Sequence, residues 1–161
     1  VITGMHHSFT GVETQLLADI ATTGGSFIFP VAAMSNVAQG AAALSVLLIL
    51  KKDNKMKGIA SASGISALLG ITEPAIFGVN LKLRYPFYGA MIGSAVSSAY
   101  IMLTKVLALA PGAAGLPGII SIRPDSMINY IIGMAISMGV AVVSTIILAK
   151  TIAKKENLEV A

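Results

Sequence analysis

The sequence contains no cysteine, so a disulfide bond, a thiolate nucleophile and a cysteine metal site are all excluded for this chain. Chemistry that needs a thiol must come from another chain or domain. Charge is also scarce, because Asp, Glu, Lys and Arg make up 11% of the residues, whereas soluble domains carry about 25%. Hydrophobic residues make up 55%, and the mean hydropathy is +0.84. These values indicate an integral membrane protein.

The few basic residues form short clusters between apolar runs. The net charge is +4 and the sequence pI is about 9.5, which in a soluble chain would suggest nucleic-acid binding. Lys and Arg clusters at the ends of apolar runs are instead typical of cytoplasmic membrane loops. We therefore expect a lipid bilayer around the chain and no nucleic-acid partner.

The apolar runs predict an all-α integral membrane fold. Three spans are expected, at residues 31–50, 85–109 and 126–149. Residues 58–78 are apolar too, but only about 15 residues precede the break near Thr72, and at 1.5 Å per residue these fall short of a hydrocarbon core of about 30 Å. We therefore expect a re-entrant hairpin there. Small residues such as Gly89 and Gly93 predict close helix packing.

The remaining organisation is that of one partial domain. Residues 1–30 are expected to be part of a histidine-bearing hairpin or loop region, and residues 31–161 the remainder of the same domain. The chain begins at Val1 within a polar segment and without an initiator Met. We therefore expect it to be a piece of a longer multi-pass protein.

Charge distribution provides a test of the hairpin. If residues 58–78 re-enter, the basic clusters at 51–57, 82–84 and 150–155 all lie on one side of the membrane, leaving only Arg123 opposite. The positive-inside rule then makes the side with the clusters cytoplasmic. If residues 58–78 cross instead, the basic loops are split between the two faces.

Glu73 is the one carboxylate of a strongly apolar stretch, within Gly70-Ile71-Thr72-Glu73-Pro74. An unpaired charge at the bilayer centre costs roughly 3 kcal/mol or more, so such a residue needs water, a partner or a ligand. Gly70 and Pro74 break the helix, and broken backbone at membrane depth is tolerated where it is buried or lines a cavity. We expect Glu73 to face a polar ligand; a buried structural acid is the alternative.

His6 and His7 form the second candidate feature. Adjacent residues on a helix point about 100° apart, so we expect one imidazole to face a ligand while the other packs or bonds to backbone. A structural polar cluster is the alternative. A metal site is not favoured, because the pair lacks the i, i+4 spacing of helical zinc ligands and no third ligand follows at a typical distance.

Other polar residues accompany the apolar runs. Asn80 follows the expected hairpin closely enough to hydrogen-bond a ligand, whereas Lys82 and Arg84 are interpreted as anchors at the membrane surface. Asn36 and Gln39 lie within the first span, where interhelical hydrogen bonds explain them as well as a substrate does. Imidazole, carboxylate and amide groups together suit an uncharged, polyhydroxylated ligand, because each hydroxyl can both donate and accept.

The segment Gly70-Ile71-Thr72-Glu73-Pro74-Ala75-Ile76-Phe77-Gly78-Val79-Asn80-Leu81, together with the upstream Gly4-Met5-His6-His7, resembles the membrane-spanning IIC domain of bacterial phosphotransferase-system sugar permeases. The resemblance covers the whole chain and falls in the glucose and sucrose superfamily. The residues after Pro74 look like the sucrose, β-glucoside and trehalose branch. Lys82-Leu83-Arg84-Tyr85-Pro86-Phe87 looks most like sucrose permeases.

The resemblance implies the C-terminal, sugar-binding half of such a permease in the bacterial inner membrane. Its implied substrate-binding residues are His6, His7, Gly70, Ile71, Thr72, Glu73 and Asn80, and Glu73 would also orient or activate the reacting sugar hydroxyl. The implied partners are a disaccharide, a phosphorylated IIB domain, upstream IIA and HPr, and a second copy of the full-length permease. No metal or cofactor is implied. Because the IIB cysteine is missing here, the chain alone is not expected to phosphorylate sugar.

Two other functions fit the same residues. One is a membrane sugar transporter or channel that never phosphorylates its solute, and the other is a membrane module that senses sugar. Dependence of uptake on a phosphoryl donor separates the phosphotransferase interpretation from both.

Overall fold

The computed structural model describes residues 8–50 and 53–156, with side-chain burial up to Thr151. Its elements are α1 (Ser8–Ala18), α2 (Ile20–Thr23), α3 (Ile28–Ile49), α4 (Asn54–Leu68), α5 (Glu73–Ala75), the π-helix η2 (Ile76–Asn80), α6 (Leu81–Leu83), α7 (Tyr85–Leu103), the 3-10 helices η3 (Leu116–Ser121) and η4 (Pro124–Ser126), and α8 (Met127–Glu156). Within the described ranges the β-pairing is limited to isolated bridges of Ala108 with Ser26 and Ile122. The predicted all-α fold is confirmed.

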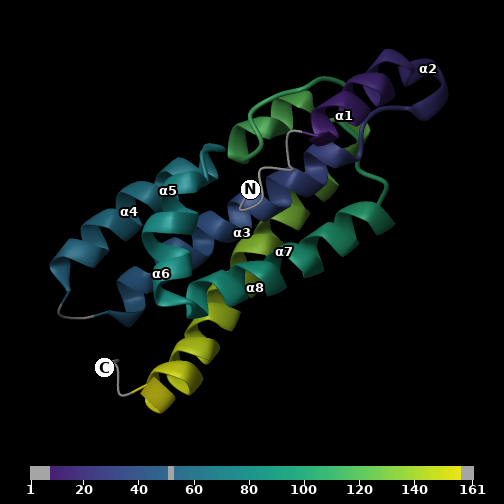
Figure 1. The fold of residues 1–161 in the computed structure, drawn as a ribbon. Helices are drawn as coiled ribbons and strands as arrows, with labels where there is room; N and C mark the ends of the chain where they lie inside the picture. The colour runs from purple at the N-terminus through teal and green to yellow at the C-terminus, as the bar shows by residue number, and fades with distance from the viewer. Residues whose placement is uncertain (1–7, 51–52, 157–161) are drawn as a thin grey trace.

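Three long helices, α3, α7 and α8, pack against one another (Figure 1). Each is long and apolar enough to cross a membrane. Most of α3 is buried by its neighbours, whereas only a third or less of the apolar windows of α7 and α8 is buried. Their exposed apolar surface suits contact with lipid, since the bilayer interior is itself apolar.

The helix bounds differ from the expected spans in two informative places. α7 ends at Leu103 rather than at 109, because Lys105 has a φ of 51° and the chain then runs extended. Ala108 and Ser26 exchange two backbone hydrogen bonds there, of 2.8 and 2.9 Å. α8 continues past the expected end at residue 149 to Glu156. The lysines there end the apolar run but not the helix, because cations are favourable near a helix C-terminus.

Glycines allow the helices to approach closely. A Cβ placed on Gly93 of α7 would lie 2.7 Å from the Cβ of Ala141 and 2.8 Å from its backbone nitrogen, and Gly89 faces α8 in the same way. α3 and α4 meet similarly, because a Cβ on Gly40 would lie 2.9 Å from the carbonyl oxygen of Gly64. Small side chains therefore set these two helix contacts, as the sequence predicts.

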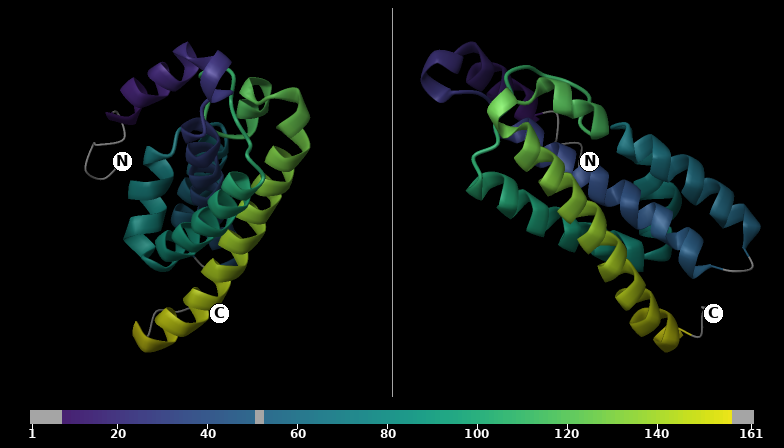
Figure 2. Two further views of the ribbon diagram at one scale, coloured as in Figure 1. Left: turned by 90° about the vertical axis from the view of Figure 1, so that its right-hand side faces the viewer. Right: turned by 180° about the vertical axis from the view of Figure 1, so that it is seen from behind.

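Residues 54–83 form a helical hairpin against α3. α4 runs along α3, the chain reverses after Gly70, α5 and η2 run back beside α4, and α6 continues to α7 (Figures 1 and 2). Gly70 has a φ of 108°, a backbone conformation that favours glycine. The hairpin thus begins and ends at the same end of the bundle, which is the geometry that a re-entrant segment requires.

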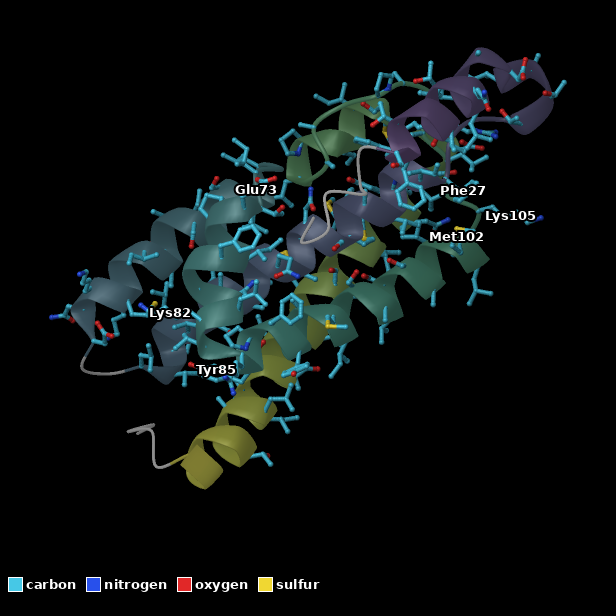
Figure 3. All side chains as sticks on the ribbon, in the orientation of Figure 1. Phe27, Glu73, Lys82, Tyr85, Met102 and Lys105 are labelled. Carbon is cyan, nitrogen blue, oxygen red and sulfur yellow. The ribbon has the colours of Figure 1, made fainter. Side chains whose placement is uncertain are left out.

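Basic residues gather at that end. Lys82 lies beside Tyr85 there, whereas Lys105 lies at the opposite end with Phe27 and Met102 (Figure 3). Because α7 stops at Leu103, Lys105 joins Arg123 at this opposite end, so the expectation that Arg123 stands there alone is wrong. Arg123 forms an exposed ion pair of 2.9 Å with Asp125, which offsets its charge.

Candidate functional site

Glu73 lines a cavity of about 480 Å³ between the hairpin tip, α3 and α1. The hairpin contributes Gly70 and Thr72 beside Glu73, and α3 contributes Ser35 and Asn36. The volume lies within the range of about 300–1,000 Å³ that is usual for small-molecule sites. Three of the sequence-predicted site residues therefore share one cavity.

The tip of the hairpin holds Glu73 at the cavity. After the turn at Gly70, the Ser66 hydroxyl donates to the Ile71 carbonyl oxygen at 3.1 Å, and the Ile71 N–H donates to the Ser66 carbonyl oxygen at 3.0 Å. Glu73 then begins α5, where Pro74 is tolerated because the first-turn N–H groups have no intrahelical acceptor. The side chain of Glu73 remains exposed to the cavity, and a carboxylate in a first turn is favoured by the helix dipole.

The loop that contains Ala114 closes one wall of the cavity. The Asn36 Nδ2 donates to the Ala114 carbonyl oxygen at 2.6 Å. The adjacent Gly115 packs directly on the carbonyl oxygen of Leu68 at the hairpin tip, and the Tyr130 hydroxyl donates to the Gly115 carbonyl oxygen at 3.0 Å. This loop therefore joins α3, α8 and the hairpin tip around the cavity.

The opposite wall comes from α1. Phe9, Thr10 and Glu13 line the cavity, and Thr10 and Glu13 are three residues apart, so they share one face of the helix. The sequence does not predict that α1 lines this cavity. The sequence feature that could have indicated it is the polar pair Thr10 and Glu13, three residues apart and shortly after the histidines. The position of α1 in the structure is what places this pair at the cavity.

Asn80 lies away from this cavity. Its Nδ2 donates to the Gln39 Oε1 at 2.6 Å and to the Gln39 carbonyl oxygen at 3.1 Å, and its side chain is fully buried. These bonds join the hairpin to α3 through the Asn80 Nδ2, whereas the buried Asn80 Oδ1 has no hydrogen-bond partner within the described ranges. Ile71 is 60% exposed and lies outside the cavity lining. His6 and His7 lie outside the described residues.

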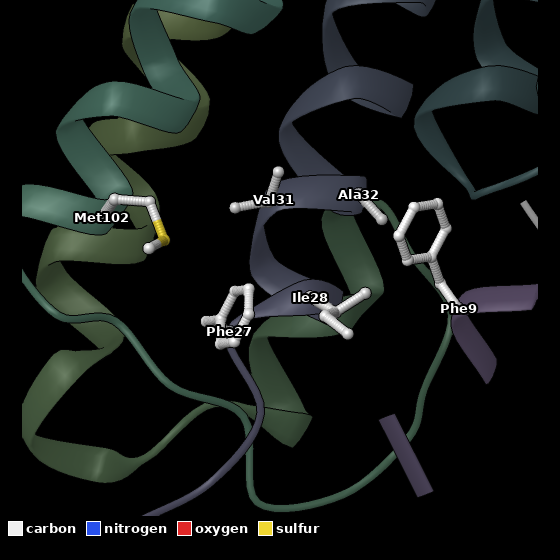
Figure 4. Close-up of a pocket in the computed structure, with 6 residues that line it drawn as sticks. All are labelled: Phe9, Phe27, Ile28, Val31, Ala32 and Met102. Carbon is white, nitrogen blue, oxygen red and sulfur yellow. The ribbon is translucent and has the colours of Figure 1, made fainter. Parts of the chain in front are cut away.

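A second, apolar groove of about 440 Å³ lies between Phe9 of α1, the start of α3 and Met102 of α7 (Figure 4). It is lined by Phe9, Phe27, Ile28, Val31, Ala32 and Met102. Because these side chains carry no hydrogen-bonding nitrogen or oxygen, the groove cannot recognise hydroxyl groups. The polar cavity at Glu73 is therefore the candidate site for a polar ligand.

The polar cavity can accept and donate hydrogen bonds without presenting a positive charge. Carboxylates, an amide and hydroxyls line it, and no Lys or Arg of the described ranges does. Such a set can hydrogen-bond neutral hydroxyl groups, and its described side chains supply no positive charge to an anion. Over the described residues, no cluster of three or more His, Cys, Asp or Glu side chains suits a metal ion.

Comparison with known proteins identifies the family. The family model for the phosphotransferase system EIIC domain matches residues 1–94. A sucrose-specific EIIBC component from Vibrio alginolyticus is 68% identical over 148 residues, which cover 92% of this chain and 31% of that protein. A sucrose-specific EIIBC component from Pasteurella multocida is 64% identical over 93% of this chain and 31% of its own length.

A trehalose-specific EIIBC component from Bacillus subtilis is 50% identical over 90% of this chain and 30% of its own length. The chain thus spans about a third of the length of the curated relatives that it matches. No solved structure matches it. With more than half of its residues matched by the family model, and with relatives of this identity, the chain belongs to the EIIC family of the phosphotransferase system.

Proposed function

We propose that this chain is the sugar-binding part of a phosphotransferase-system permease for a disaccharide, sucrose in the first instance. The observation that carries the proposal is the cavity at Glu73, which offers carboxylate, amide and hydroxyl groups to a neutral, hydroxyl-rich ligand. The names of the sucrose-specific relatives support sucrose over other disaccharides. The trehalose-specific relative makes trehalose the second candidate.

In this function Glu73 has two roles. Its carboxylate accepts a hydrogen bond from the sugar hydroxyl that will be phosphorylated, which holds the ring. The same contact makes the hydroxyl oxygen more nucleophilic and gives its proton a place to go as the phosphoryl group arrives. The phosphoryl group comes from the phosphocysteine of a IIB domain, since this chain has no cysteine of its own.

The remaining parts of the system are proposed on the same basis. Upstream IIA and HPr supply the phosphoryl group to IIB, and a second copy of the full-length permease completes a homodimer. The protein lies in the bacterial inner membrane with several passes, α3, α7 and α8 cross it, and the hairpin of residues 54–83 re-enters from the cytoplasmic side. The basic residues at the open end of the hairpin support this orientation.

The test uses the full-length parent permease in membrane vesicles, with its IIB partner and with or without a phosphoryl donor. We expect sucrose uptake to require the donor and to yield sugar phosphate inside the vesicle. Uptake that proceeds equally well without the donor supports a non-phosphorylating transporter instead.

The decisive variant is Glu73→Gln, which keeps the shape and an acceptor but removes the charge. General-base assistance is worth about a hundredfold or more in rate, so we expect measurable sugar binding but loss of most donor-dependent uptake. His6→Ala and His7→Ala are expected to weaken binding by about 1–3 kcal/mol at whichever imidazole contacts sugar. A Glu73→Gln permease that expresses normally and transports at the wild-type rate would show that Glu73 is a structural acid.

A further inference from the structure

Glu13 lines two cavities at once. It is half-buried on α1 and borders the cavity of about 480 Å³ that contains Glu73. Together with Thr10 it also borders a second cavity, of about 350 Å³, which extends along the same face of α1 to Leu17 and Ala18. Glu73 does not border this second space. Thr10 and Glu13 therefore stand at the junction of the two cavities.

The second cavity has the mixed lining that suits a sugar ring. Thr14 joins Thr10 and Glu13 as hydrogen-bonding groups, while Leu17 and Pro111 supply apolar surface. A sugar ring likewise carries hydroxyls around its rim and C–H groups on its faces, so it needs both kinds of contact. A ligand held at Glu73 that is longer than one ring would extend past Thr10 and Glu13 into this space.

We propose that Glu13 is a specificity-determining residue that binds the second sugar ring of a disaccharide whose first ring is held at Glu73. This inference rests on the proposed function of the Glu73 cavity. It assigns the two carboxylates different tasks, since Glu73 contacts the ring that receives the phosphoryl group and Glu13 contacts the ring that does not.

The local hydrogen bonding leaves Glu13 able to do this. The Ser26 hydroxyl donates to the Glu13 Oε1 at 3.3 Å, and the Ser26 Oγ also accepts from the Ile28 N–H at 3.2 Å. Ser26, itself fully buried, thus orients one carboxylate oxygen. The other, Oε2, has no hydrogen-bond partner among residues 8–50 and 53–156 and can accept from a hydroxyl of the ligand.

The experiment measures binding of sucrose and of methyl α-glucoside, which has the glucosyl ring alone, to the full-length permease and its variants. We expect Glu13→Gln to weaken sucrose binding about tenfold or more, the usual effect of losing a charge-assisted hydrogen bond. Binding of methyl α-glucoside should change by less than about twofold, because that sugar does not reach Glu13. The wild-type protein should prefer sucrose, and Glu13→Gln should reduce this preference.

Two control variants separate ligand contact from structure. Asp19→Asn removes an acid of the same region that borders neither cavity, and it should leave both affinities unchanged. Ser26→Ala removes the intramolecular partner of Glu13 while keeping the carboxylate, and it should affect sucrose binding less than Glu13→Gln does.

Four results would overturn the proposal: an equal loss for both sugars in Glu13→Gln, no loss for either, a Ser26→Ala effect as large as that of Glu13→Gln, or a wild-type protein with no preference for sucrose. None of these is the failure of the proposed function itself. That failure is a wild-type protein that binds neither sugar, or full donor-dependent uptake in Glu73→Gln.

Discussion

The contact between α7 and α8 at Gly93 allows a quantitative test of the fold. A methyl group at Gly93 would lie 2.7–2.9 Å from the Cβ, backbone nitrogen and Cα of Ala141, and backbone atoms cannot move aside as a flexible side chain can. Overpacking of this kind costs about 1–3 kcal/mol. The higher helix propensity of alanine, worth about 1 kcal/mol relative to glycine, offsets part of this overpacking cost.

Gly139 provides the matched control, because it is an exposed glycine within α8 and a Cβ there has no neighbour within 4 Å. Gly139→Ala gains the propensity without the clash, so the difference between the two variants isolates the packing cost. We expect Gly93→Ala to be less stable than Gly139→Ala by about 1–3 kcal/mol. The measurement is equilibrium unfolding of the full-length permease in micelles. Equal stability of the two variants would refute the packing of α7 on α8 at this position.

Two further predictions concern the hairpin. Asn80→Asp should be more destabilising than Asn80→Leu, because it replaces the N–H donor that faces two Gln39 oxygens with a third oxygen. Asn80→Leu only loses the two hydrogen bonds, worth about 0.6–1.7 kcal/mol each in a membrane. The same unfolding measurement checks the order of stability, and the reverse order would contradict the assigned bonds. Single cysteines placed at Asn54 and Lys150 of this thiol-free sequence should react with an impermeant maleimide from the cytoplasmic side. A cysteine at Lys105 should react from the other side. Labelling of Asn54 and Lys150 from opposite sides would rule out the re-entrant hairpin.

The sequence predicts the helices well because burial in a membrane depends mainly on local hydropathy. Apolar length and flanking charge locate α3 and the start of α8 within a few residues, and the break at Gly70 and Pro74 locates the hairpin tip. The end of α7 is not predicted. Its cause is the backbone pairing of Ala108 with Ser26, and such long-range pairing leaves no trace in local hydropathy.

The sequence predicts residues of the candidate site only where they lie in one continuous segment. Gly70, Thr72 and Glu73 are adjacent in the sequence, so a single motif identifies all three. Asn36, by contrast, reaches the cavity wall through a bond to Ala114, which is 78 residues away. The sequence alone also does not show whether the Gln39 side chain bonds to another helix or to a ligand, because an amide can do either. The position of Asn80, whose Nδ2 donates to the Gln39 Oε1, identifies the partner.

The walls of the cavity at Glu73 are unequally attached, and this bears on where the cavity can open. Moving the hairpin tip away from the loop at Ala114 would separate backbone surfaces that are in direct contact at Gly115. Moving the loop itself would also break the hydrogen bond from the Asn36 amide to the Ala114 carbonyl oxygen. Moving α1 away from the segment before α3 would break one long side-chain hydrogen bond, in which the Ser26 hydroxyl donates to Glu13. The cavity is therefore easier to open beside α1 than at the hairpin tip, which is the more firmly attached of the two walls.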